Sequence, residues 1–222
     1  MKFSIITIFP DLIRSYTEES ILGRAQADGH IKVDVIDPRD FAEDKHNSVD
    51  APPYGGGPGM VMQAEPIIRA VDSVDYDPES VGVIIFSATG DQFTNEGARD
   101  LTERYDHIIM ICGRYEGVDE RIKQMLCGTI GCERLHEVSV GPYVLTGGEL
   151  PALTVIDATA RQISGVLGNE SSREEERVLG APTYTRPETI HYNDQDYSVP
   201  DVLMSGHHAR IEGWREDKAK EE

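Results

Sequence analysis

Five short apolar segments, separated by stretches with helical periodicity, constrain the fold of this chain more than any other feature. The segments are almost uninterrupted runs of apolar residues, as expected for strands that are covered on both faces of a sheet. They are Lys2–Phe9, Ile31–Asp37, Val81–Phe86, His107–Cys112 and the weaker Leu135–Val140. Helical patterns lie between and after them, at Asp11–Ala27, Glu65–Val74, Asn95–Arg104, Val118–Leu126 and Leu150–Gln162. This alternation predicts an α/β domain with a mainly parallel sheet.

The pattern changes in the last quarter of the chain. A length of 222 residues with 39% hydrophobic residues suits one substantial domain and a small appendage. We expect the α/β domain over residues 1–164. Residues 165–200 are rich in Gly, Ser, Glu and Pro with little periodicity, which is typical of a linker. Residues 201–222 place Ile211 and Trp214 in a charged context, which predicts one short helix that needs a partner surface.

The cysteines and the absence of long apolar runs limit the class of protein. No run approaches the roughly 20 residues of a membrane span, and Met1–Pro10 lacks the features of a signal peptide. The sequence therefore predicts a cytoplasmic protein. Three cysteines, Cys112, Cys127 and Cys132, have no framework spacing, so we expect reduced thiols. A zinc site of Cys127, Cys132 and His136 is the alternative, but it lacks a fourth ligand.

The formal net charge of −19 argues against RNA as a partner, because RNA-binding surfaces are usually positive. Net charge is a sum over the whole surface, however, and a local cluster of cations can still hold phosphates. The cations are fifteen Arg and six Lys. Arginine is the better residue for phosphate forks and for stacking on bases, so composition leaves RNA binding open.

Glycine-rich turns follow several of the predicted strands. Ser87–Thr94, Gly113–Gly117 and Gly141–Glu149 are loops of this kind, and ligands of open α/β sheets bind at such strand ends. A fourth loop, Tyr54–Met60, holds four glycines. It lacks the Gly-Lys-Ser/Thr ending of a nucleotide P-loop, and no strand directly precedes it. A flexible surface turn is the alternative interpretation of this loop.

Six motifs occur together in one order along the chain. They are Pro38-Arg-Asp-Phe41, Tyr54–Met60, Gly113–Gly117, Tyr143–Pro151, Gly165–Gly168 and Tyr184-Thr-Arg-Pro-Glu188. In this combination the chain closely resembles the bacterial TrmD family of tRNA (guanine-N1)-methyltransferases, which are SPOUT enzymes. The resemblance extends from Ile6-Thr-Ile-Phe-Pro10 to Ser205-Gly-His-His-Ala209.

The resemblance implies a fold that the pattern of apolar residues does not show. It implies a SPOUT-type, mainly parallel sheet with a deep trefoil knot, followed by a linker over 165–200. The helical RNA-binding segment over 201–222 is shorter than in the family and would be a truncated form of it. The resemblance also implies a homodimer that acts on tRNA, with no membrane contact.

The implied reaction moves a methyl group from S-adenosylmethionine to N1 of the guanine immediately 3′ of the anticodon. The cofactor would bind in a bent shape among three loops. Glycine-rich turns expose main-chain groups that can read the adenine edge, and aromatic side chains can enclose the ring. Glu116 would make a polar contact near the methionine moiety or the target base, or else form a structural ion pair. The residues implied for the cofactor are Ser87, Ala88, Thr89, Gly90, Gly113, Tyr115, Glu116, Val140, Gly141, Pro142, Tyr143, Val144, Leu145, Gly147 and Gly148.

By the same resemblance, a carboxylate in the linker removes the proton from N1, and an arginine stabilises negative charge on O6. Arg161 matches the arginine, and the carboxylate position falls on Glu176, where the family has aspartate. The extra methylene displaces the carboxylate by about an ångström, a scale that matters for catalysis. Glu174 or Glu175 takes the role if the register shifts, and a solvated acidic linker with no role is the alternative.

Contacts to RNA are implied in the glycine-rich loop and near the C-terminus, since RNA loops are read by stacking bases on aromatic or arginine faces. The residues are Tyr54, Gly57, Gly59, Met60, Arg114, Arg186 and His207. A lone histidine is more often a packing residue than a contact.

Mg²⁺ assists many family members, and the acidic residues here allow a site without locating it, so no residue is assigned to a metal.

Two other functions fit part of the pattern. One is a SPOUT enzyme that methylates ribose 2′-hydroxyls, but Arg161 with a linker carboxylate suits removal of a proton from a base ring. The other is a cofactor-binding RNA module that has lost catalysis through Glu176 and the short C-terminal segment.

Overall fold

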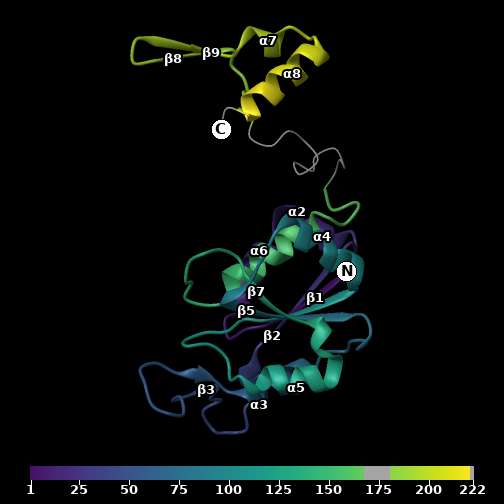
Figure 1. Cartoon of the computed structure of the whole chain (residues 1–222), viewed down its shortest axis with the longest axis vertical. Coiled ribbons are helices and arrows are strands. Elements are labelled where there is room, and N and C mark those ends of the chain that lie inside the picture. Colours follow the sequence, from purple (N-terminus) through teal and green to yellow (C-terminus); the bar gives the residue numbers. More distant parts are fainter. Residues whose placement is uncertain (168–180, 221–222) are drawn as a thin grey trace. The chain divides into compact units, whose positions relative to one another are not determined.

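The computed structural model describes residues 1–167 and 181–220. The chain divides into two compact units, Met1–Gly168 and Asn169–Glu222, and each is described by itself (Figure 1).

A five-stranded sheet forms the centre of the first unit. Its strands are β1 (Lys2–Ile6), β2 (Lys32–Ile36), β5 (Val81–Gln92), β6 (His107–Ile111) and β7 (Leu135–Ser139). They lie in the order β2-β1-β6-β5-β7, and every neighbouring pair is parallel. The predicted α/β fold with a mainly parallel sheet is therefore confirmed. Two short strands, β3 (Asp50–Ala51) and β4 (Val61–Met62), form a separate antiparallel pair.

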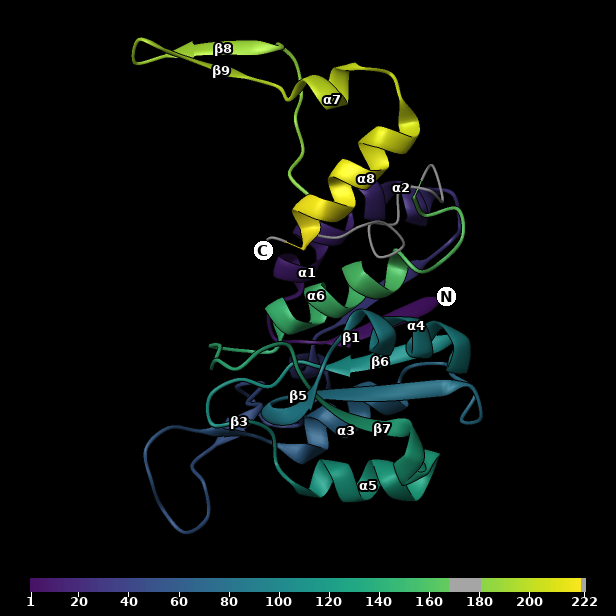
Figure 2. The ribbon, with the colours of Figure 1, turned by 45° about the horizontal axis from the view of Figure 1, so that its top comes forward.

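Helices cover both faces of this sheet (Figure 2). On one face lie α1 (Pro10–Thr17), α2 (Ser20–Ala27), α4 (Asn95–Arg104) and α6 (Glu149–Ala160), which share one hydrophobic cluster with the sheet. On the other face lie α3 (Ala64–Asp72) and α5 (Arg121–Ile130), which share the second cluster. Two 3₁₀ turns, Pro38–Phe41 and Cys132–Arg134, complete the unit. Within residues 1–167 and 181–220, no helix is long and apolar enough to cross a membrane.

Side chains of the central strands alternate between the two clusters, as the period of two in a strand requires. In β6, Ile108 and Met110 pack in the first cluster, whereas Ile109 and Ile111 pack in the second. All four are fully buried. Because a central strand has no solvent-facing side, its sequence is an unbroken run of apolar residues. The edge strands β2 and β7 are only half-buried, which explains the weaker pattern of β7.

The single helix expected over Asp11–Ala27 is wrong, because the chain breaks it into α1 and α2. Glu18 ends α1, and Ser20 begins α2 with a left-handed φ of 53°. A Cβ on Gly23 would collide with the carbonyl of Glu18. The break lets both short helices pack an apolar face on the sheet, which one straight helix of this length would not do.

Strand β5 is longer than expected, since it runs to Gln92 instead of ending at Phe86. After Phe86 the strand bulges, and pairing with β7 resumes at Asp91. The expected loop over Ser87–Thr94 is therefore a bulge followed by more strand. Similarly, α5 begins at Arg121 rather than at Val118 and continues to Ile130.

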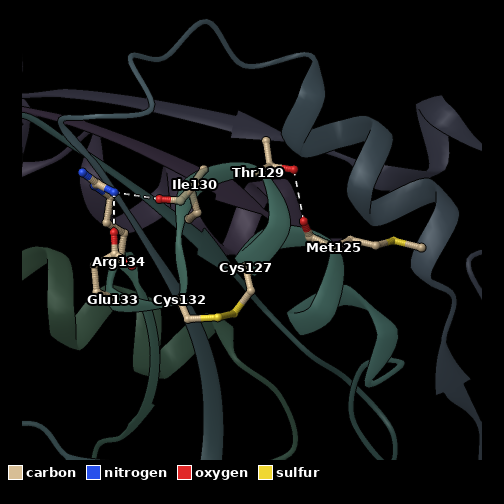
Figure 3. The surroundings of a disulfide bond; sticks show 7 residues. All are labelled: Met125, Cys127, Thr129, Ile130, Cys132, Glu133 and Arg134. Atoms are coloured by element: carbon tan, nitrogen blue, oxygen red, sulfur yellow. Dashed lines mark hydrogen bonds and ion pairs between the residues drawn. A yellow bond between two sulfur atoms is a disulfide. The ribbon is translucent and has the colours of Figure 1, made fainter.

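The expectation of reduced thiols is wrong for two of the three cysteines. Cys127 of α5 forms a disulfide with Cys132 (Figure 3). Between them the chain turns sharply at Gly131, whose φ is 88°, and this turn brings the two Cα atoms to 4.3 Å. Cys112 is free and buried. His136 does not approach the cysteines as a ligand, because its Nε2 lies 2.8 Å from the Tyr105 hydroxyl.

The second unit contains a hairpin that the sequence did not reveal. Strands β8 (Thr189–Tyr192) and β9 (Gln195–Ser198) pair antiparallel, and Asn193 and Asp194 between them both have positive φ. Two residues of this conformation are typical of a tight hairpin turn. Helices α7 (Asp201–Met204) and α8 (His208–Ala219) follow, and α8 is the short helix that the sequence predicts.

Candidate functional site

A cavity of about 340 Å³ opens where β6 and β7 end, beside the bulge of β5 that follows Phe86. This is the carboxyl edge of the sheet, where open α/β sheets bind their ligands. The volume lies in the range of small-molecule sites. The bulge of β5 and the loops after β6 and β7 form most of the wall of the cavity.

Most of the residues predicted to bind a cofactor line this cavity. They are Ser87, Ala88, Gly113, Tyr115, Glu116, Val140, Gly141, Tyr143, Val144, Leu145, Gly147 and Gly148. Thr89, Gly90 and Pro142 do not line it. Gly90 packs instead against β7, where a Cβ would lie 2.7 Å from the main chain of Glu137. The predicted residues that line the cavity come from all three predicted segments.

The loop after β6 is held from outside by the segment that leads to β4. The main-chain amide of Glu116 donates to the carbonyl of Met60 at 3.0 Å. Tyr115 has a left-handed φ of 59°, and a hydrogen bond to the Asp50 carboxylate raises the pKa of its hydroxyl. The loop is thus fixed by contacts from β3 and from the residue before β4.

The glycine-rich loop predicted to bind RNA contacts the loop after β6 directly. Gly59 has a φ of 81°, and a Cβ there would collide with the carboxylate of Glu116. The positive φ favours glycine at this position, since the carboxylate of Glu116 is the end of a flexible side chain and can move. Gly57 has open space around its Cα, and the side chain of Tyr54 is fully exposed. One end of the loop therefore packs on the cavity wall, while the other end is free to contact a large ligand.

The loop after β7 presents main-chain donors to the cavity. A Cβ on Gly141 would collide with the ring of Tyr143, whose hydroxyl donates to the carbonyl of Val140 at 3.2 Å. Within the part of the chain that the structure describes, the amides of Val144 and Leu145 donate to no main-chain or side-chain acceptor. Such amides can bind the polar edge of a base.

One charged wall of the cavity was missed by the sequence analysis. Lys123 lies 2.8 Å from Glu137 and 3.0 Å from Glu120, and all three line the cavity. The hydrogen bond that Lys123 donates to the Glu137 carboxylate raises the pKa of Lys123. The sequence could have indicated Lys123 only through its position, because Lys123 lies in the helix that follows the Gly113–Gly117 turn.

Arg114, which the sequence assigns to RNA, faces a carboxylate inside the protein. Its Nε donates to Oε2 of Glu149 at 2.9 Å. Glu149 begins α6 and is 2% exposed. No local sequence pattern distinguishes Glu149, although it lies in the Tyr143–Pro151 motif.

Of the two predicted catalytic residues, the structure describes only Arg161, which does not line the cavity. Arg161 is the last residue of the α6 region, and its Nε is buried without a hydrogen-bond partner among the described residues. Because Glu149 at the start of α6 lies at the cavity, a rise of 1.5 Å per residue places Arg161 about 18 Å away along the helix. Glu176, with its neighbours Glu174 and Glu175, lies outside the described residues.

The remaining predicted RNA contacts belong to the second unit. Arg186 is exposed and precedes a cis peptide bond to Pro187. His207 is exposed and precedes the first residue of α8. Neither residue is buried by packing within its unit.

Among residues 1–167 and 181–220, no group of three or more His, Cys, Asp or Glu side chains is arranged to hold a metal ion.

Comparison with known proteins identifies the family. A family model described as tRNA (Guanine-1)-methyltransferase TrmD matches residues 1–222 of the chain. The chain belongs to the TrmD family. This confirms the resemblance seen in the six ordered motifs. The trefoil knot and the dimer that the TrmD family implies stay predictions.

Curated relatives in the TrmD family cover nearly the whole chain, and each is named tRNA (guanine-N(1)-)-methyltransferase. The protein of Dictyoglomus turgidum is 44% identical over 223 residues, which are 99% of this chain and 85% of the relative. The protein of Staphylococcus epidermidis is 44% identical over 98% of this chain and 85% of its own length. The protein of Pseudoalteromonas atlantica is 42% identical over 98% of this chain and 79% of its own length.

Proposed function

We propose that this chain transfers a methyl group from S-adenosylmethionine to N1 of the guanine immediately 3′ of the anticodon of tRNA. The observation that carries the proposal is the cavity among three glycine-rich loops at the carboxyl edge of the sheet, in a chain of the TrmD family. We further propose that it acts in the cytoplasm, where bacterial tRNA matures.

The cavity suits a nucleoside attached to a cationic tail. The unpaired amides of Val144 and Leu145 can donate to the adenine edge, and the rings of Tyr115 and Tyr143 can enclose the base. The carboxylate of Glu116 lies on the same wall, where a negative charge favours a cationic ligand. When bound, S-adenosylmethionine supplies an electrophilic methyl group on a positively charged sulfur.

The reaction requires a base and a group that stabilises negative charge. A bond forms between guanine N1 and the methyl carbon, the bond from that carbon to sulfur breaks, and the N1 proton leaves. We assign the proton to the carboxylate of Glu176 and the stabilisation of O6 to the guanidinium of Arg161. The support for Arg161 is its buried Nε, which has no partner among the described residues. Buried N–H donors are rarely left without a hydrogen-bond acceptor.

We propose that a second copy of the chain completes the site. Within one chain, Arg161 lies about 18 Å from the cavity end of α6, too far to act on a ligand in that cavity. Phe9 before α1, Leu12 and Tyr16 on α1 and Leu150 at the cavity end of α6 are exposed apolar side chains. A face of this kind on neighbouring helices is typical of a symmetric dimer. In such a pair, Arg161 of one copy can reach the cavity of the other.

For RNA recognition we propose the exposed tip of the glycine-rich loop and the exposed cations of the second unit. Tyr54 is fully exposed and can stack on an unpaired base. Gly57, Gly59 and Met60 would bring that loop to the RNA. Arg186 and His207 would contact phosphates, and Tyr54 would be the strongest contact of the set.

The test is methyl transfer from labelled S-adenosylmethionine into an unmodified tRNA transcript with guanine after the anticodon, beside the same transcript with adenine there. We expect label only in the guanine transcript, and N1-methylguanosine after digestion to nucleosides. A 2′-O-methylated nucleoside would indicate a SPOUT enzyme of the other kind. Cofactor binding with no incorporation at any salt concentration would indicate an RNA-binding module without activity.

A further inference from the structure

The most deeply buried charge near the cavity is the carboxylate of Glu149, and both of its oxygens are occupied. The Thr7 hydroxyl donates to Oε1 at 2.7 Å, and Nε and Nη2 of Arg114 lie 2.9 and 2.8 Å from Oε2. A charge with 2% of its surface exposed is stable only when it is paired in this way. The three residues come from the end of β1, the loop after β6 and the start of α6.

Arg114 is held on its other sides as well. Its guanidinium carbon lies 4.4 Å from the ring centroid of Phe9, and Nη1 lies 3.5 Å from the carbonyl of Thr146. The side chain is only 20% exposed. A residue that binds RNA phosphates needs its donors free in solvent. Most of the donors of Arg114 are instead directed into the protein.

The same residue lies at the junction between the two cofactor loops. Arg114 forms an isolated antiparallel bridge with Gly147, and the amide of Gly148 donates to the carbonyl of Gly113 at 2.9 Å. A Cβ on Gly147 would collide with Nε of Arg114. The loop after β6 and the loop after β7 are therefore joined at one point, and the guanidinium packs directly on that junction.

We propose that Arg114 and Glu149 form a positioning pair, which sets the spacing of the two cofactor loops, and that Arg114 does not contact RNA. This inference rests on the proposed function, because it assumes that the cavity binds S-adenosylmethionine. The carboxylate of Glu149 holds the guanidinium of Arg114, and the Thr7 hydroxyl holds the carboxylate of Glu149. The junction at Gly147 and Gly148 then keeps the walls of the cavity at the distance the ligand needs.

The test compares Arg114→Gln and Arg114→Lys with Arg99→Gln, which removes one exposed positive charge on α4, outside the cavity. Three quantities are measured for each full-length variant: the Kd for S-adenosylmethionine by calorimetry, the KM for tRNA, and hydrogen exchange at the Gly148 amide. We expect Arg114→Gln to raise the cofactor Kd about tenfold and to speed exchange at Gly148, with the KM for tRNA within about twofold. Arg99→Gln should change none of the three.

Arg114→Lys separates geometry from charge. Lysine keeps the positive charge that attracts phosphates but cannot place two donors on one carboxylate. A positioning pair predicts that Arg114→Lys fails nearly as badly as Arg114→Gln. A phosphate contact predicts that lysine restores most of the activity and that the KM for tRNA, rather than the cofactor Kd, rises in Arg114→Gln. That second pattern, or an unchanged cofactor Kd in both variants, overturns the proposal.

Thr7→Val keeps the inference testable if both Arg114 variants fail to fold. It removes one hydroxyl and leaves the charges of Arg114 and Glu149 in place, so we expect a rise of about threefold in the cofactor Kd and an unchanged KM for tRNA. An unchanged Kd would contradict the proposal. If the wild-type chain binds the cofactor but methylates no tRNA, the proposed function fails, while the cofactor Kd and the exchange at Gly148 still decide the role of the pair.

Discussion

The two ends of helix α6 lie at opposite edges of the sheet and carry charged side chains in opposite situations. Glu149, at the carboxyl edge, is buried with both oxygens paired. Arg161, at the amino edge, has a buried Nε with no partner among the described residues. At the first end, the carboxylate of Glu149 is paired within one chain, and these contacts hold the cavity in shape. At the second end, Nε of Arg161 finds no acceptor within the described part of the chain, as expected for a group that acts on something outside it.

At the same edge, Oγ1 of Thr159 is also buried without a partner among the described residues, whereas two other groups are paired. The buried ring of His107 lies 2.9 Å from the Ser4 hydroxyl. The disulfide between Cys127 and Cys132 closes the turn that leads into β7. We therefore expect variants of these groups to change stability, and variants of Arg161 to change methyl transfer.

Replacing Arg161 should have the largest effect. We expect Arg161→Ala to lower kcat for tRNA methylation by about 10²–10³-fold, because it removes a donor that stabilises charge developing on the guanine O6. The cofactor Kd should stay within about twofold, and the melting temperature should barely change. Single-turnover methylation and calorimetry measure these quantities. Arg161→Lys, which keeps the charge, should retain part of the activity, and a tenfold loss of cofactor affinity in either variant would place Arg161 in the cavity instead.

His107 should make the protein less stable in acid. Burial is the main cause that lowers its pKa from 6.5 to about 4, so the folded protein favours the neutral ring. The unfolded chain binds the proton more readily, and the stabilisation is therefore complete above pH 6.5 and lost as the pH falls toward 4. The loss amounts to roughly 3 kcal/mol over this interval.

Urea unfolding at several pH values checks this, with His107→Gln as the variant that no longer titrates. His46→Gln replaces an exposed histidine and is the matched control. The difference between wild type and His107→Gln should grow as the pH rises from 4 to 6.5, and a difference that is constant with pH would refute the assignment. The cofactor Kd of His107→Gln should equal that of wild type at pH 7.5.

The sequence predicted the sheet, the loops after β6 and β7 and the family, because each of these leaves a local signal, whereas the expected loop over Ser87–Thr94 is a bulge within β5. Strands buried on both faces are apolar throughout, and turns that approach a ligand need glycine. It did not predict the break before Ser20 or the pairing of Glu149 with Arg114. These depend on contacts between residues far apart in the chain, such as Thr7 with Glu149. For the same reason Arg114, judged by its residue type alone, was assigned to RNA.

Breaking the disulfide should have a moderate effect on stability only. For a loop this short, the chain-entropy estimate is about 2 kcal/mol. We expect Cys132→Ser to lower the free energy of unfolding by that amount and to leave tRNA methylation unchanged. Thiol counting in denaturant without reductant should find one free thiol per chain, that of Cys112. Three free thiols would show that the cysteines are reduced in solution.

Thr7→Val should have the smallest effect on stability, because it removes one neutral donor to Glu149 at the start of α6. We expect a loss of about 1 kcal/mol in the free energy of unfolding, from one unsatisfied oxygen of Glu149. Thr154→Val is the control, since it removes an exposed hydroxyl from the same helix. Equal unfolding curves for the two variants would show that the Thr7 hydroxyl adds nothing to the pairing of Glu149.

The most direct test of the contrast is a mixed pair of two inactive variants. One copy carries Arg161→Ala, and the other carries Leu145→Pro, which removes a main-chain amide of the cavity. The two are expressed together with different tags, and pairs that hold both tags are purified and assayed for N1-methylguanosine in tRNA. If the cavity of one copy works with Arg161 of the other, the mixed pair has one intact site and should recover about half of the wild-type activity. A doubly tagged pair with no activity would show that the cavity and Arg161 serve the same chain, and failure to recover any such pair would contradict the dimer itself.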